Sequence, residues 1–177
     1  MKEISNQPAK DRFSRLDLFG VPACTYRVER IDHDQKHLYA DLFNQYRLSR
    51  YEKPEKTVGH RMGGGWFDSE PVLFIVLTSK PASIPVGFIQ LYLLSSSSDT
   101  AKATIVNDLY VLPDYRNNGA ALKLTEAAVK FAIQNNSAFI RLEILQENYS
   151  AKKLFESVGF KCQTPAPGFN VYSIRLA

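Results

Sequence analysis

The 177-residue chain has few of the residues that build disulfide frameworks and metal centres. Its two cysteines, Cys24 and Cys162, are too few for a disulfide framework or a cysteine zinc site, so we expect buried free thiols. Of its three histidines, His33 and His37 have a spacing that fits one helix face, and only His60 remains as a third ligand. We therefore predict no metal.

Long apolar runs are also missing. No stretch approaches the roughly 18 to 20 apolar residues of a membrane-spanning helix, and the start, Met1 to Pro8, lacks the apolar segment of a signal peptide. We expect a cytoplasmic protein that does not bind membranes. The net charge is +4, but Lys and Arg are scattered rather than clustered, so we expect no nucleic-acid partner either.

The length and the pattern of apolar residues predict one mixed α/β domain, preceded by a polar N-terminal arm, residues 1–23. Helical spacing predicts one helix that ends near Ser49, a second from about Leu122 and a third after Asn148. Apolar and β-branched runs predict strands at 26–31, 72–78, 86–94, 103–112, 140–144 and 170–176.

A loop of small residues lies between a predicted strand and a predicted helix. The strand ends before Pro113, which cannot donate to a sheet ladder. The loop from Arg116 to Ala121 combines a cation with one glycine and two alanines. Backbone N–H groups and the positive end of the helix dipole favour a phosphate there. The dipeptide Asn118-Gly119 is also common in hairpin turns, but a helical pattern rather than a strand follows it.

This loop resembles the signature Gln/Arg-x-x-Gly-x-Gly/Ala of the GNAT family of acyl-CoA-dependent N-acetyltransferases. In that family the loop wraps the pyrophosphate of coenzyme A, and the preceding strand presents backbone groups to the pantetheine and the thioester. The resemblance implies that the chain binds acetyl-CoA as a co-substrate. The residues that it assigns to the cofactor are Leu109, Tyr110, Val111, Arg116, Asn117, Asn118, Gly119, Ala120 and Ala121.

A second block, residues 148–160, resembles the family pattern Asn-x-x-Ala-x-x-Leu-Tyr-x-x-x-Gly-Phe. It differs at one position, because Phe155 stands where the family usually has Tyr. That phenol is a frequent acid for the departing CoA thiolate, and Phe has no proton to give. The resemblance therefore implies CoA contacts by Asn148, Ala151 and Phe155 and leaves the acid unassigned. From the residues alone, Asn148 caps the predicted helix and Gly159 ends it.

The resemblance covers residues 24–177 and implies the GNAT fold, a mostly antiparallel sheet whose parallel fourth and fifth strands splay apart, flanked by helices. Two helices are expected between the first two strands. In the family they form one wall of the acceptor site. Residues 42–52 loosely resemble the Tyr-Arg-x-Phe-Tyr stretch of the histone- and polyamine-type branch, which makes Tyr46, Tyr51 and Glu52 candidates for substrate contact. An aromatic core with a solvated Glu explains them equally well.

An acceptor amine must lose a proton before it attacks, so a carboxylate or a carboxylate-bound water is the expected base. Asp108 shares a predicted strand face with Tyr110, and Glu143 lies on the adjacent strand of the family sheet. Each acid also has an ordinary explanation as a solvated or salt-bridged residue. Tyr149 is a candidate for the acid.

We interpret the chain as an enzyme that moves an acetyl group to a primary amine by direct attack in a ternary complex. The acceptor is a small cationic amine, a polyamine, an aminosugar or a lysine side chain. One alternative is an acyl-CoA-binding regulatory module with weakened catalysis, and another is an acetyltransferase of peptide N-termini. Family members are often dimers, so a homodimer is possible.

Overall fold

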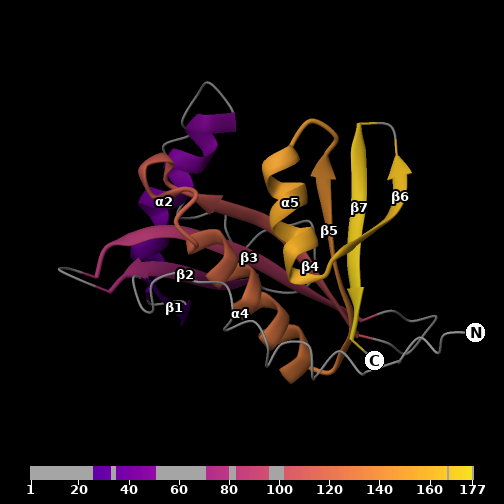
Figure 1. The fold of residues 1–177 in the computed structure, drawn as a ribbon. Helices are drawn as coiled ribbons and strands as arrows, with labels where there is room; N and C mark the ends of the chain where they lie inside the picture. The colour runs from indigo at the N-terminus through magenta and orange to yellow at the C-terminus, as the bar shows by residue number, and fades with distance from the viewer. Residues whose placement is uncertain are drawn as a thin grey trace, which may run out of the picture.

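The computed structural model contains one seven-stranded sheet with helices on both faces (Figure 1). The strand order is β1-β2-β3-β4-β5-β7-β6. The residues that the structure describes are 26–32, 35–50, 71–79, 83–95, 102–166 and 168–176. The elements are β1 (Tyr26–Ile31), α2 (Lys36–Arg50), β2 (Val72–Thr78), β3 (Pro85–Ser95), β4 (Lys102–Val111), the 3-10 turn η3 (Pro113–Tyr115), α4 (Ala120–Gln134), β5 (Ser137–Leu145), α5 (Tyr149–Val158), β6 (Lys161–Ala166) and β7 (Phe169–Arg175).

The predicted fold class is confirmed. All neighbouring strands pair antiparallel except β4 and β5, which are parallel. The predicted strands at 26–31 and 72–78 have the bounds of β1 and β2. The predicted N-terminal arm and the second of the two expected helices, which would fall within residues 51–70, lie outside the described residues.

The two faces of the sheet carry different helices, because side chains alternate along each strand. On one face, Tyr39 and Leu42 of α2 pack with Ile75 of β2 and Phe88 of β3. On the other face, residues of α4 and α5, among them Leu124, pack with strand residues such as Val76, Ile89 and Ile140. Both layers exclude water from the middle of the sheet, and α2 therefore lies opposite α4.

The parallel ladder between β4 and β5 is short. It ends at the pair Ile105↔Arg141, although β4 continues to Val111 and β5 to Leu145. Figure 1 shows the two strands diverging from their common start, β4 toward α2 and β5 alongside β7. Asn107 falls where the register with β3 shifts, between the pairs Leu91↔Val106 and Gln90↔Asp108. Such a bulge bends a strand and changes the direction of its side chains.

The turn between β6 and β7 is short, because the two strands stay paired as far as Ala166↔Phe169. One expectation for this C-terminal region is wrong. Cys162 is free but exposed rather than buried, because β6 is the edge strand of the sheet. Cys24 lies outside the described residues.

The longest described helices, α2 and α4, have 15 residues each. Within the described part of the chain, no helix combines the length and the apolar character that crossing a bilayer requires.

Candidate functional site

The loop after β4 is built by two left-handed residues. Tyr115 N–H donates to the Leu112 carbonyl at 3.0 Å, which closes the 3-10 turn after the strand. Asn117 follows with φ 59° and Gly119 with φ 85°. Asparagine and glycine are the residues that adopt this region at low cost, which explains their places in the loop. The chain thereby reverses direction within a few residues and enters α4.

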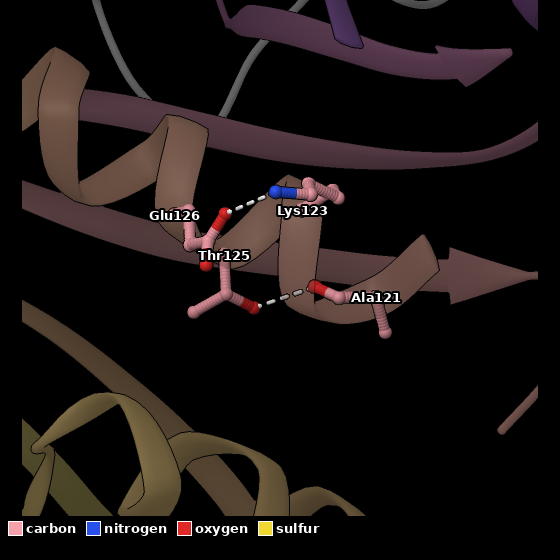
Figure 2. A network of polar contacts seen from close by, with 4 residues as sticks. All are labelled: Ala121, Lys123, Thr125 and Glu126. Atoms are coloured by element: carbon pink, nitrogen blue, oxygen red, sulfur yellow. Dashed lines mark hydrogen bonds and ion pairs between the residues drawn. The ribbon is translucent and has the colours of Figure 1, made fainter. Parts of the chain in front are cut away.

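The first backbone N–H groups of α4 are not capped by a side chain. Gly119 is the N-cap residue and supplies no side-chain cap, and α4 begins at Ala120 rather than near Leu122 as predicted. Figure 2 shows two polar contacts in this part of the helix. The Thr125 hydroxyl donates a hydrogen bond to the Ala121 carbonyl at 2.9 Å, and Lys123 Nζ donates to Glu126 Oε2 at 3.3 Å. These two contacts use side-chain groups and one backbone carbonyl, and neither uses a backbone N–H group. The first N–H groups of a helix have no partner inside it, so they suit an anion.

Arg116 turns back onto the strand. Its Nε donates to the Val111 carbonyl at 2.9 Å, and its guanidinium lies 5.8 Å from the ring centroid of Tyr110. The side chain therefore fixes the end of β4 against the loop.

These features fit acetyl-CoA. Beyond Ile105, the edge of β4 that faces β5 has no strand partner among the described residues. Its backbone groups, apart from the Val111 carbonyl that accepts from Arg116, therefore suit a pantetheine arm. The loop that follows offers N–H groups, small side chains and one cation to a pyrophosphate. The predicted cofactor residues from Leu109 to Ala121 lie in one stretch of chain, from the end of β4 through the loop into the first turn of α4.

The second predicted block forms α5. Asn148 caps the helix, because its Oδ1 accepts from the Ala151 N–H at 3.1 Å, and Gly159 ends it with φ 103°. Phe155 is only 3% exposed, and its ring packs edge-on against Phe160 with centroids 5.2 Å apart. The structure therefore places Asn148 at a helix start and Phe155 in the core beneath it. Their contacts with CoA remain a prediction.

Asp108 and Tyr46 meet on the α2 face of the sheet. The Tyr46 hydroxyl donates to Asp108 Oδ1 in a short hydrogen bond, across 62 residues of sequence. The Asn107 amide donates to Oδ2 at 2.7 Å. Tyr110, on the same face of β4, has its ring centroid 5.5 Å from that of Tyr46. The strand that carries the predicted cofactor surface therefore also carries a hydrogen-bonded carboxylate.

Three further residues with polar side chains surround this carboxylate. Gln90, the β3 partner of Asp108, donates to the Tyr92 hydroxyl at 3.0 Å. Tyr39 of α2 is fully buried, and its hydroxyl has no hydrogen-bond partner among the described residues. Burial, followed by the negative charge of Asp108, raises the pKa of Tyr39 and that of Tyr92, so both phenols stay protonated near neutral pH.

The remaining candidates lie elsewhere. Glu143 is on β5 and forms an exposed ion pair with Arg141 at 3.3 Å. Tyr149 begins α5, is 70% exposed and lies with its ring centroid 5.2 Å from Lys152 Nζ. Glu143 and Asp108 therefore stand on the two diverging strands. Tyr51 and Glu52 lie outside the described residues.

Sequence reasoning missed Tyr39, Gln90 and Tyr92. Alternation along the predicted strand at 86–94 places Phe88, Gln90 and Tyr92 on one face, and that signal marks an unusual polar pair inside an apolar strand. Nothing local points to Tyr39, which reads as an ordinary core aromatic. Within the described residues, no group of three or more His, Cys, Asp and Glu side chains is arranged to hold a metal.

Comparison with known proteins gives consistent matches. The model of the acetyltransferase (GNAT) family matches residues 32–160. The uncharacterised N-acetyltransferase YhfO of Bacillus subtilis (strain 168) is 31% identical over 142 residues, covering 77% of this chain and 89% of the relative. Thialysine N-epsilon-acetyltransferase of Bos taurus is 28% identical over 82 residues, covering 46% of this chain and 48% of that enzyme.

Solved structures match as well. The structure of a probable acetyltransferase superposes with a TM-score of 0.66 and 27% identity, covering 78% of this chain and 91% of the other. Structures with coenzyme A or acetyl-CoA bound are among those that share the fold.

Proposed function

Because the chain belongs to the GNAT family of acetyltransferases, and is thus an acetyl-CoA-dependent N-acetyltransferase, we propose that its acceptor is a small cationic primary amine. The observation that carries this proposal is the position of Asp108. Its carboxylate lies on β4, next to Leu109 to Val111, which are predicted to bind the thioester. On the α2 face of the sheet it accepts a hydrogen bond from Tyr46. A negative charge there attracts an ammonium group and receives its proton, directly or through a water.

The reaction is direct attack in a ternary complex. The amine nitrogen forms a bond to the thioester carbon, and the bond from that carbon to the CoA sulfur breaks. Holding donor and acceptor together supplies much of the rate, since proximity is worth up to about 7–11 kcal/mol in favourable cases. Backbone groups at Leu109 to Val111 polarise the thioester carbonyl. Water or a phenol returns a proton to the thiolate.

The name of one similar enzyme supports a small amine acceptor more than a peptide acceptor. The bovine relative acts, by its name, at the ε-nitrogen of thialysine, which favours a small amine over a peptide N-terminus. Polyamines, aminosugars and lysine side chains remain in the same chemical class. The buried position of Phe155, where the family has a phenol, motivates the alternative of a weakened CoA-binding module.

A thiol-release screen of small amines, polyamines, aminosugars, lysine peptides and peptides with free N-termini tests the proposal. Turnover of small amines that falls about 10²-fold or more in Asp108→Asn is the expected result. Glu29→Gln is the matched control, because its carboxylate forms an exposed pair with Arg27 on the edge strand β1. Turnover confined to peptide N-termini, or CoA binding without any turnover, would reject the proposal in favour of one of the alternatives.

Two further predictions from the sequence accompany this function. A cytoplasmic location and a homodimer are both compatible with an enzyme that takes acetyl-CoA and a small amine. Light scattering on the purified protein measures its molar mass and so distinguishes a homodimer from a monomer.

A further inference from the structure

Tyr46 was expected to touch the acceptor, but its hydroxyl is already occupied. The phenol donates to Asp108 Oδ1, and the ring packs among three other aromatic rings of the α2 face. The centroid distances from Tyr46 are 6.1 Å to Phe43, 5.7 Å to Phe88 and 5.5 Å to Tyr110. This packing fixes the direction in which the phenol points.

The carboxylate of Asp108 has little orientation of its own, because the terminal torsion of an aspartate is broad. Here two donors act on different oxygens. Tyr46 holds Oδ1 from α2, and Asn107 holds Oδ2 from the neighbouring position on β4. The Asn107 contact is local to a bulged strand, whereas the Tyr46 contact comes from a separate helix. The hydrogen bond from Tyr46 therefore ties the orientation of the carboxylate to the position of α2.

We propose that Tyr46 is a positioning residue that acts through Asp108, holding the carboxylate in the orientation that receives the acceptor ammonium. This role rests on the proposed function, which assigns Asp108 to the acceptor. It replaces direct substrate contact by Tyr46 with an indirect role, and it makes the junction of α2 with β4 part of the catalytic geometry.

A double-mutant cycle measures this role. Tyr46→Phe removes one oxygen and keeps the ring contacts, Asp108→Asn removes the charge, and the third variant carries both changes. With the amine found in the screen, Tyr46→Phe is expected to lower kcat about 10-fold and to leave KM for acetyl-CoA unchanged. In the Asp108→Asn background the same change is expected to have no further effect on kcat, because the carboxylate that Tyr46 orients is gone, although the Asn amide oxygen can still accept its hydrogen bond.

Tyr172→Phe is the control. Tyr172 likewise donates to a carboxylate, that of Glu156 at 3.1 Å, but it is buried and lies on β7 in the cluster with α4 and α5. The kcat of the Tyr172→Phe variant should equal that of the wild type. A thermal melt of each variant separates loss of folding from loss of rate.

Three results would overturn the inference. An unchanged kcat in Tyr46→Phe means that the contact only ties the helix to the sheet. Effects that multiply in the double variant mean that Tyr46 acts independently of Asp108, as it would through direct contact with the acceptor. A wild-type kcat in Asp108→Asn removes the role of Asp108, and with it both the proposed function of that residue and this inference.

Discussion

Phe155 packs edge-on against Phe160, with ring centroids 5.2 Å apart, at the position where the family usually has a tyrosine. The side chain is 3% exposed and belongs to the core that α4 and α5 share with the sheet. Its ring contributes packing at this position. The enzyme therefore has to release the CoA thiolate without the usual phenol.

Phe155→Tyr should not raise kcat more than about 10-fold. A thiol with a pKa of about 8.5 is a tolerable leaving group near neutral pH, so an external acid is dispensable. If the new hydroxyl finds no partner, the free energy of unfolding falls by about 1–3 kcal/mol. Steady-state kinetics and urea unfolding measure both quantities. A much larger gain in kcat would mean that thiolate protonation limits the native enzyme.

Tyr149→Phe and Tyr110→Phe should each keep kcat near that of the wild type. Tyr149 is 70% exposed beside Lys152, and Tyr110 is buried with its ring on the α2 face, so neither has the setting of a dedicated acid. Both changes retain the ring and remove only the hydroxyl. A loss of about 10²-fold in either variant would instead identify a phenolic acid.

Asn118→Glu should weaken acetyl-CoA binding by about tenfold or more, and Asn118→Gln should change it little. Asn118 is exposed in the loop between the two left-handed residues Asn117 and Gly119. The Glu side chain adds a negative charge beside the helix start that is predicted to hold the pyrophosphate, while the Gln control has the same size. Isothermal titration measures both affinities. Equal binding by the two folded variants would place the pyrophosphate elsewhere.

Local signals in the sequence predicted the frame of this site. Asn148 and Gly159 bracket α5 as expected, because capping depends on residues a few positions apart. The residues from Arg116 to Gly119 lie in the loop between β4 and α4 for the same reason, since Pro and Gly constrain the backbone locally.

Long-range geometry was not predictable in the same way. The contact between Tyr46 and Asp108 spans 62 residues and depends on where α2 lies over the sheet, which no local pattern encodes. Cys162 is likewise exposed because β6 lies at the edge of the sheet. The order of strands in a sheet cannot be predicted from the sequence of one strand. Tyr39 reads as a core residue in the sequence, and only packing reveals that its hydroxyl is buried beside a carboxylate.

Gly87→Ala should lower the free energy of unfolding by about 1–3 kcal/mol. A Cβ at this position would lie 2.6 Å from the Tyr110 carbonyl oxygen, so β3 and β4 would have to separate. Ser95→Ala, at the exposed end of the same strand, is the control and should change stability by less than about 0.5 kcal/mol. Urea unfolding compares the two. Equal stabilities would show that the strands adjust without cost.

The last prediction concerns Tyr39, whose buried hydroxyl has no partner among the described residues. Burial first, and then the charge of Asp108, raise its pKa in the folded protein above the value of 10.0 expected when it is exposed. Below that pH the phenol is protonated in both states and adds no pH dependence. Above it, the unfolded chain releases the proton and the folded chain keeps it. Stability therefore falls by up to about 1.4 kcal/mol per pH unit.

Tyr39→Phe removes this loss together with the unsatisfied hydroxyl. At pH 8 the variant should be at least as stable as the wild type, and its advantage should grow between pH 10 and pH 11, as measured by urea unfolding at each pH. Tyr172→Phe should behave differently at pH 8, losing about 1 kcal/mol, because the Tyr172 hydroxyl has Glu156 as its partner. If Tyr39→Phe is instead destabilised at pH 8, its hydroxyl has a stabilising partner. A difference from the wild type that stays constant up to pH 11 would mean that the fold does not favour the neutral phenol.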